Sequence, residues 1–199
     1  MDIKIPYTPR KHQAYLHNQI SRSRWSVLVC HRRFGKTVCM INHLIRSALT
    51  SKNKNPRYAY ISPTFKQSKA IAWDYMKQFT AKIPFTKFNE TELRVDLPNG
   101  SRITLLGSEN SDSLRGIYLD GCVIDEYANV NEKLFPEIIR PALSDRKGYC
   151  VFIGTPQGMN NNFYELYQHA QGADDWFHYK AKASQTKIVD EEELTKAKE

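Results

Sequence analysis

An apolar run that passes through a short loop into Gly-Lys-Thr constrains the fold more than any other part of this sequence. Residues 26–30 read SVLVC, which is typical of a short buried strand, and residues 31–34 form a largely polar loop. Gly35-Lys36-Thr37 comes next, and residues 38, 41, 44, 45, 48 and 49 are then apolar, at the spacing of one helical face. Strand, loop and helix in this order predict a phosphate-binding loop, because the loop amides and the positive end of the helix attract phosphate.

Each residue of the tripeptide has a chemical role in such a loop. Gly35 lets the backbone approach a phosphate group, Lys36 reaches the β- and γ-phosphates of a nucleotide, and the Thr37 hydroxyl binds Mg²⁺. The strict pattern G-x-x-x-x-G-K-[ST] has glycine at position 30, where this chain has Cys30. The tripeptide alone is weak evidence, so the prediction depends on its strand–loop–helix setting.

A pair of acidic residues ends another apolar run. Residues 122–126 read CVIDE, which resembles the end of a Walker B strand. In that role Asp125 holds Mg²⁺ through its outer shell, and Glu126 orients and deprotonates the attacking water. A strand that ends in a solvated acidic turn is the structural alternative. The order of the two motifs along the chain favours the catalytic interpretation.

Phosphoryl transfer is also accelerated by an arginine that meets the negative charge developing on the γ-phosphate. Arg32 and Arg33 lie inside the loop, and Arg115 lies in SLRG, shortly before CVIDE. The structural alternatives are exposed loop cations for the first two and a turn residue beside Gly116 for the third. The sequence alone leaves these alternatives open.

Strand-like and helix-like segments alternate along the chain, which predicts an α/β fold with a mostly parallel sheet covered on both faces. Residues 98–100, Pro-Asn-Gly, predict a β-hairpin between two alternating segments. The predicted strands are 26–30, 57–63, 119–126, 149–156 and 176–182, and the predicted helices are 9–21, 36–50, 64–82, 132–144 and 162–171. Residues 190–199 read as the start of one more, highly charged helix.

Composition narrows the class of protein and of partner. The chain has 199 residues, 41% of them hydrophobic and 25% charged, which argues against collagen-like, disordered and disulfide-scaffold classes. Its four cysteines form no CxxC pair, and no apolar run reaches the roughly 18 residues of a membrane span. We therefore predict a cytoplasmic protein without a membrane anchor. The formal net charge of +8 favours a polyanion such as DNA or RNA, although an ordinary basic protein has such a charge too.

Four segments in chain order, HRRFGKT, SPTFKQSK, SLRGIYLDGCVIDE and IGTPQG, resemble the large terminase subunit of tailed bacteriophages. The resemblance is to its N-terminal packaging-ATPase domain and covers nearly the whole chain. Cys30 fits it, because large terminases commonly have R-x-x-G-K-[TS] at this point. The resemblance implies a P-loop fold of the additional-strand, RecA-like type, a three-layer sandwich with a β-hairpin insertion. It also implies that ATP and Mg²⁺ are used to translocate double-stranded DNA into a procapsid.

The resemblance also implies roles for individual residues. TPRKHQ looks like the adenine-binding Q motif of the family, which points to Gln13; the alternative is a polar residue on an exposed helix. Arg115 falls on an arginine proposed to enter the ATP site of the neighbouring subunit. Thr155, in IGTPQG, falls on the motif that couples hydrolysis to DNA movement, and its alternative is an ordinary strand-to-loop turn. The loop residues expected at the nucleotide are Arg32, Arg33, Phe34, Gly35, Lys36 and Thr37, with Arg32 at the position of the family's P-loop arginine.

The partners implied are double-stranded DNA held by its backbone, a portal protein, a small terminase subunit and further copies of the chain in a ring. The resemblance places this assembly in the host bacterial cytoplasm, transiently docked on the viral procapsid, and we expect the isolated chain to be monomeric. Candidate phosphate contacts are Lys52, Lys54, Arg57, Lys66 and Lys69, whose alternative is a solvated basic face.

Residues 1–185 are expected to be the ATPase domain, and residues 186–199 the start of a linker helix toward an absent C-terminal nuclease domain. Nuclease activity is therefore expected to be absent. Two other functions stay open: one lobe of a superfamily-two-type helicase or translocase, and a nucleotide-dependent DNA-binding adaptor that does not hydrolyse ATP. GTPQG and LRG favour the terminase over the helicase. Intact Lys36, Thr37, Asp125 and Glu126 argue against the adaptor.

Overall fold

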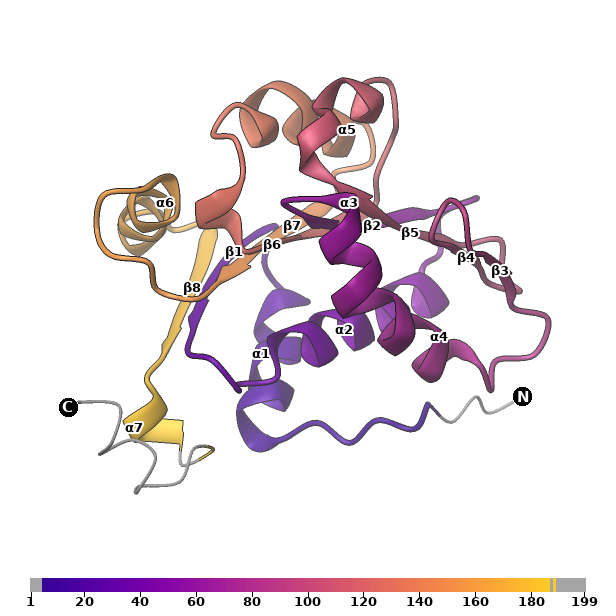
Figure 1. Cartoon of the computed structure of the whole chain (residues 1–199), viewed down its shortest axis with the longest axis horizontal. Coiled ribbons are helices and arrows are strands. Elements are labelled where there is room, and N and C mark those ends of the chain that lie inside the picture. The colour runs from indigo at the N-terminus through magenta and orange to yellow at the C-terminus, as the bar shows by residue number, and fades with distance from the viewer. Residues whose placement is uncertain (1–4, 187, 189–199) are drawn as a thin grey trace.

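A computed structural model describes residues 5–186 and 188, without the side chains of residues 112 and 113 (Figure 1). In this part of the chain, eight strands form one sheet in the order β3-β4-β5-β2-β6-β7-β1-β8. The parallel strands are β1 (Trp25–Cys30), β2 (Arg57–Ser62), β5 (Arg102–Gly107), β6 (Gly121–Asp125), β7 (Tyr149–Gly154) and β8 (Trp176–Ala181). The short strands β3 (Lys87–Asn89) and β4 (Arg94–Asp96) pair antiparallel. The predicted mostly parallel sheet is confirmed.

Helices cover both faces of this sheet, as Figure 1 shows. One face carries α1 (Lys11–Ile20), α2 (Lys36–Thr50), α3 (Phe65–Gln67), a π-helical segment η1 (Ser68–Trp73) and α4 (Asp74–Thr80). The other carries a π-helical segment η4 (Phe135–Ile139), α5 (Arg140–Ser144) and α6 (Asn162–Gln171). The remaining short elements are the 3₁₀ segments η2 (Ser108–Leu114) and η3 (Tyr127–Asn129), and α7 (Ala183–Thr186). The sandwich therefore has three layers.

The core lies in two layers, one on each side of the sheet. Every residue of β1 and of β6 is buried, as expected for parallel strands with helices on both faces. Under one face, α2 contributes Ile41, Leu44 and Ile45, none of which is exposed to solvent. Under the other, Phe152 of β7 packs edge-on against Phe135 with their ring centroids 4.7 Å apart. Burial of these apolar groups supplies the main driving force for folding.

The helix predicted for residues 64–82 is present, but its buried face differs from the prediction. Ala72, Met76 and Phe79 are buried as expected, whereas Ile71 is 48% and Tyr75 39% exposed. The cause is the π-helical segment η1, because each π turn holds an extra residue and rotates the following side chains around the axis. The rotation buries Trp73 instead, which the spacing had not selected.

The remaining predicted elements agree with the structure within a few residues at their ends. The Pro-Asn-Gly hairpin joins β4 to β5, and Gly100 has the positive φ of 83° that such a turn uses. The sequence reading did not include β3, which is only three residues long. The helix predicted for residues 190–199 lies outside the described residues.

The topology decides where the sequence motifs meet. β7 lies between β1 and β6 and pairs parallel with both. Parallel strands end at the same edge of a sheet, so the segments that follow these three strands are brought together. These segments are the Gly-Lys-Thr loop, the acidic pair and Thr155. β7, the strand that Thr155 follows, therefore lies beside β1, the strand of the loop.

Candidate functional site

The backbone of the loop requires glycine at position 35. Gly35 has a φ of 84° and precedes the first residue of α2, in a left-handed conformation that costs other residues energy. A Cβ at this position would lie 2.9 Å from Nε2 of Gln13, closer than side chains normally pack. Arg33 also has a positive φ, of 64°. The loop is therefore a sharp turn that ends on the helix N-terminus.

Helix α1 holds this turn from outside. The Gln13 side chain is 4% exposed; its Nε2 donates to the Gly35 carbonyl at 3.3 Å, and its Oε1 accepts from the Arg10 backbone N–H at 2.9 Å. Arg10 Nη1 donates to the Phe34 carbonyl at 3.4 Å. Gln13 is thus placed at the loop, where it bonds the chain's own backbone. Its contact with adenine stays a prediction.

The other loop residues divide into exposed and buried ones. The side chains of Arg32 and Arg33 are exposed, so they can reach a bound molecule. Phe34 is fully buried, against His31 and Tyr179, and anchors the loop to the core. Only the backbone of Phe34 is therefore available to a nucleotide, which narrows the prediction made from sequence.

Lys36 connects the loop to the segment after β7. Its Nζ donates to the Cys30 carbonyl at 3.4 Å and to Thr155 Oγ1 at 3.3 Å. Burial raises the pKa of the Cys30 thiol to about 12, so the side chain at this position stays a neutral thiol. The Lys36 ammonium group therefore contacts two neutral oxygens, a backbone carbonyl and a hydroxyl. Phosphate oxygens would replace them with stronger, charge-assisted contacts.

Thr155 extends this contact to the acidic pair. Its Oγ1 donates to Glu126 Oε1 at 3.1 Å, and its backbone N–H lies 3.5 Å from Glu126 Oε2. Glu126 itself has a left-handed backbone, with φ 47° and ψ 49°. Such a conformation is costly for glutamate and is found at functional sites more often than elsewhere. Lys36, Thr155 and Glu126 therefore form one chain of hydrogen bonds.

Asp125 is held by two donors at the buried end of β6. Its Oδ1 accepts from the Glu126 backbone N–H at 2.9 Å, and its Oδ2 accepts from the Tyr60 hydroxyl. Burial raises the pKa of Asp125, while the Tyr60 hydrogen bond and the charge of Lys36 act in the opposite direction. Only 6% of the residue is exposed, so its orientation is set by these partners.

Tyr60 is a site residue that the sequence reading missed. It lies on β2, beside β6, and is fully buried; burial and Asp125 raise its pKa, while the nearby Thr37 side chain acts to lower it. Thr37 and Asp125, the two predicted Mg²⁺ ligands, therefore share one neighbour. The available signal was weak: Tyr60 is one of two tyrosines in the strand RYAYIS, which follows the loop helix.

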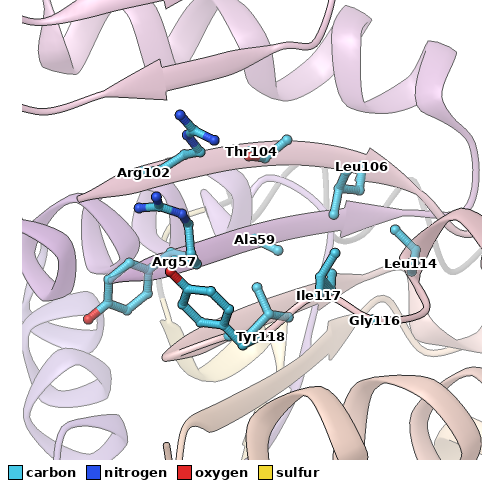
Figure 2. Close-up of a pocket in the computed structure, with 11 residues that line it drawn as sticks. Arg57, Ala59, Arg102, Thr104, Leu106, Leu114, Gly116, Ile117 and Tyr118 are labelled. Atoms are coloured by element: carbon cyan, nitrogen blue, oxygen red, sulfur yellow. The ribbon is translucent and has the colours of Figure 1, made fainter. Parts of the chain in front are cut away.

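Arg115 is not among the side chains that contact one another in this cluster, as far as the described residues show. It follows η2, its side chain is 56% exposed, and its Nη2 lies 4.0 Å from Glu137 Oε2. The same loop closes a cavity of about 330 Å³ over β2 and β5, with Leu106, Leu114 and Ile117 in its wall (Figure 2). None of the residues predicted to bind the nucleotide or Mg²⁺ lines that cavity, but the predicted phosphate contact Arg57 does.

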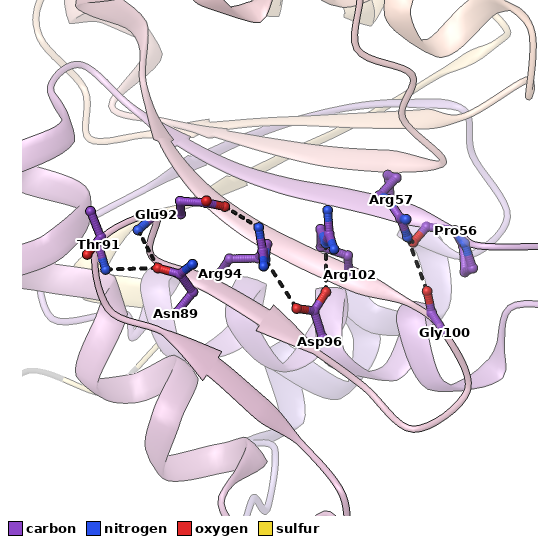
Figure 3. Close-up of polar contacts among 9 residues, drawn as sticks. All are labelled: Pro56, Arg57, Asn89, Thr91, Glu92, Arg94, Asp96, Gly100 and Arg102. Atoms are coloured by element: carbon purple, nitrogen blue, oxygen red, sulfur yellow. Dashed lines mark hydrogen bonds and ion pairs between the residues drawn. The ribbon is translucent and has the colours of Figure 1, made fainter.

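The predicted basic groups lie at opposite edges of the sheet. Exposed Lys52 and Lys54 precede β2. Exposed Lys66 and Lys69 follow it, so they lie at the edge of the sheet that also carries the Gly-Lys-Thr loop. Arg57 donates through Nη1 to the carbonyls of residues 56 and 100, both at 3.1 Å (Figure 3). Beside it, Asp96 bridges residues 94 and 102, which ties the hairpin into an ion-pair network.

The described residues contain neither a membrane-spanning helix nor a preformed metal-binding cluster. No helix among them is long and apolar enough to cross a membrane. No group of three or more His, Cys, Asp or Glu side chains in that part of the chain is arranged to hold a metal ion. The predicted Mg²⁺ ligands, Thr37 and Asp125, offer one hydroxyl and one carboxylate.

Comparison with known proteins supplies a family. Residues 29–197 match the family described as "Terminase large subunit, T4likevirus-type, N-terminal". The large terminase subunit of Escherichia phage T5 is 28% identical over 174 residues, which are 84% of this chain and 38% of that protein. The chain thus spans well under two thirds of the length of the curated relatives it matches.

Solved structures of the same kind have this fold. The ATPase domain of the large terminase of Thermus phage P74-26 has a TM-score of 0.74 at 22% identity, over 90% of this chain and 83% of that one. The large terminase of a thermophilic bacteriophage, solved in complex with ADP, has a TM-score of 0.79 at 17% identity, over 94% of this chain and 49% of that one. The predicted P-loop, RecA-like fold is confirmed.

Proposed function

This chain belongs to the family of T4likevirus-type large terminase subunits, within their N-terminal region, and from this premise we propose that it hydrolyses ATP to move double-stranded DNA into a viral procapsid. One observation carries the proposal. Lys36, Thr37, Asp125 and Glu126 come from two distant parts of the sequence and meet at one edge of the sheet. There Thr155 bonds both Lys36 and Glu126, and Tyr60 bonds Asp125.

ATP is the proposed ligand of the Gly-Lys-Thr loop. The turn ends on the N-terminus of a 15-residue helix, whose free amides favour a phosphate group. Lys36 at present contacts two neutral oxygens and would exchange them for phosphate oxygens. The similar terminase of the thermophilic bacteriophage was solved with ADP, which supports this assignment. Gln13 and Arg10 hold the loop in shape, and Gln13 is the candidate contact for adenine.

The donor set fits Mg²⁺. Thr37 offers a hydroxyl and Asp125 a carboxylate, both hard oxygen donors of the kind that Mg²⁺ prefers together with water and substrate phosphates. Bound there, Mg²⁺ would neutralise phosphate charge that develops during transfer. Asp125 is held in place by two donors, so its carboxylate is oriented before any ligand arrives.

Glu126 is the proposed general base. Its carboxylate follows the buried strand β6 and lies beside Thr155, at the edge where the loop presents phosphate. A base in this position accepts a proton from water while that water attacks phosphorus. Thr155 is the proposed coupling residue, because its single hydroxyl hydrogen goes to Glu126 while its oxygen accepts from Lys36. When a phosphate binds Lys36, Thr155 loses its hydrogen bond from Lys36. The hydrogen bond between Thr155 and Glu126, the proposed base, then changes as well.

We propose that two arginines stabilise the negative charge that develops on the γ-phosphate during transfer. Arg32 is exposed in the loop and can act within its own subunit. The Arg115 side chain is 56% exposed, as that of a group reaching into a neighbouring copy would need to be. We assign Arg115 to the neighbouring site and Arg32 to the same subunit, in a ring of several copies.

The wider assembly follows from family membership. We propose that the ring grips DNA through phosphates, docks transiently on the procapsid in the host bacterial cytoplasm, and works with a portal protein and a small terminase subunit. Lys66 and Lys69 are the favoured DNA contacts, because they follow β2 at the same edge of the sheet as the nucleotide site. Residues 1–185 form the proposed ATPase domain, and most of the proposed linker of residues 186–199 lies outside the described residues.

The test is the steady-state ATPase rate against protein concentration, with Mg²⁺, in the presence and absence of DNA. A rate per subunit that rises with concentration means that a neighbour completes the site. A constant, measurable rate assigns the catalytic arginine to the same subunit and removes Arg115 from the mechanism. Binding of ATP without turnover at any concentration would refute the motor and favour a non-hydrolysing adaptor.

A further inference from the structure

We propose that Tyr60 is the positioning residue of the metal site, holding the Thr37 hydroxyl and the Asp125 carboxylate in the orientation in which they bind Mg²⁺. The inference rests on the proposed ATPase function and adds a residue to it. Neither the sequence motifs nor the family match assigns this tyrosine a role.

The position of Tyr60 follows from strand register. β2 pairs parallel with β6, and Tyr60 stands opposite Val123, two residues before Asp125. Side chains two residues apart on a strand point to the same face, so Tyr60 and Asp125 share the face that α2 covers. The phenol packs in the core layer that α2 covers, and Thr37 is the second residue of that helix.

The hydroxyl of Tyr60 has one hydrogen, and the structure shows where it goes. Asp125 is a carboxylate that accepts, so Tyr60 donates to Oδ2. The Tyr60 oxygen can then only accept from other donors, and the Thr37 side chain lies close enough to lower the pKa of Tyr60. In the proposed arrangement the Thr37 hydroxyl is that donor, so hydrogen bonds run from Thr37 to Tyr60 to Asp125.

This direction suits a metal site. A hydroxyl that binds a cation must direct its lone pair to the metal and its hydrogen elsewhere, and Tyr60 provides the acceptor for that hydrogen. The carboxylate is held by Tyr60 at one oxygen and by the Glu126 N–H at the other, so it cannot rotate freely. Partners that orient metal ligands in this way commonly change metal affinity when they are removed.

The phenol is also a rigid spacer. Tyr60 is fully buried between the sheet and α2, with no exposed surface, so its ring cannot swing out toward solvent. A water molecule would offer the same donor and acceptor but no fixed position. Tyr60 thus links the helix that carries one ligand to the strand that carries the other.

The test replaces only the hydroxyl. Binding of the fluorescent analogue N-methylanthraniloyl-ADP is titrated with Mg²⁺, and again in EDTA, for the wild-type chain and Tyr60→Phe. We expect the half-saturating Mg²⁺ concentration to rise about tenfold or more in Tyr60→Phe, the range seen when a partner of a metal ligand is lost. Nucleotide affinity in EDTA should stay unchanged, which a general disruption of the loop would not allow.

Tyr58→Phe is the matched control. Tyr58 lies on the same strand and face, and its hydroxyl donates to the Ser47 carbonyl at 3.2 Å, away from the metal ligands. Its Mg²⁺ titration should follow the wild type. Equal titrations for Tyr60→Phe and wild type would overturn the proposal, and so would equal shifts in the two variants. If the wild type bound the nucleotide equally well with Mg²⁺ and in EDTA, the proposed function would be refuted, and this inference with it.

A second measurement does not depend on the stability of a Phe variant. Site-specific 3-fluorotyrosine at position 60 keeps the hydroxyl and reports its surroundings by ¹⁹F NMR. Addition of Mg²⁺ to the ADP complex should shift this resonance, and the same label at position 58 should not shift. An unchanged resonance at position 60 while Mg²⁺ binds would overturn the proposal.

Discussion

The contact between α1 and α2 predicts that the chain loses stability in mild acid. His17 and His43 stack there with their Nδ1 atoms 3.2 Å apart, and both are buried. The groups around them are Tyr7, whose hydroxyl is 3.0 Å from His17 Nε2, together with Cys39 and Arg46. One Nδ1 must donate and the other accept, so at least one ring must be neutral, and a proton on both Nδ1 atoms would leave two donors and two like charges face to face.

The size of the effect follows from the two pKa values. Burial, with the charge of Arg46, lowers the pKa of His17 to about 4; burial, with His17 and Arg46, lowers that of His43 to about 3. Unfolded histidines take up protons near pH 6.5, so between pH 6.5 and 4 the unfolded chain binds more protons. Folding stability is therefore complete above pH 6.5 and falls by about 1.4 kcal/mol per histidine for each pH unit below it.

For two histidines the loss between pH 6.5 and 4.5 is about 5 kcal/mol, which is comparable with the whole stability of many domains. The assay is urea unfolding followed by circular dichroism at several pH values. His43→Phe keeps a ring beside Tyr149 but removes one titrating group, so the pH dependence should fall to about half. The exposed His178, replaced by Gln, is the control and should leave it unchanged. Equal pH dependence in wild type and His43→Phe would refute the reasoning.

Three further predictions concern the site. Glu126→Ala should bind ATP normally and lose hydrolysis, whereas Lys36→Ala should weaken binding itself; near-normal turnover by Glu126→Ala in a phosphate-release assay would remove the general base. Mixed Arg115→Ala and Glu126→Ala subunits should regain part of the ATPase rate, and no rescue in proven assemblies would count against a role between subunits. Thr155→Val should lower kcat about tenfold, since a lost hydrogen bond to a charged group costs roughly 1.5 kcal/mol, while Thr155→Ser keeps the rate. Equal kcat in the two Thr155 variants would show that the hydroxyl has no catalytic effect.

Prediction from sequence succeeded where the information is local. The strand, loop and helix around Gly35 are contiguous, and the apolar spacing of α2 is that of a helix against a sheet. The hairpin at Gly100 was equally readable, because its turn chemistry lies in three adjacent residues. The prediction of buried residues failed at Ile71 and Tyr75, because a π-helical segment changes the number of residues per turn. No residue type in the sequence indicates such a segment.

Side-chain partners across the fold were out of reach of the sequence. Residues 60 and 125 are far apart in the chain and meet only because β2 and β6 are neighbours in the sheet. The hydrogen bonds from Arg10 and Gln13 to the loop carbonyls likewise depend on how α1 packs. Phe34 could be read as a loop residue, but only packing decided that its side chain is buried.

The sequence by itself determined the chemistry available to this protein: a turn that needs glycine, a lysine and a hydroxyl at a helix N-terminus, and an acidic pair at the end of a strand. These depend on neighbouring residues and on the periodicity of helix and strand. Only the tertiary structure decided that β7 lies between β1 and β6, and therefore that Thr155 touches both Lys36 and Glu126. The reason is physical: strand order is set by burial of both faces of the sheet, a property of the whole chain and of no single segment.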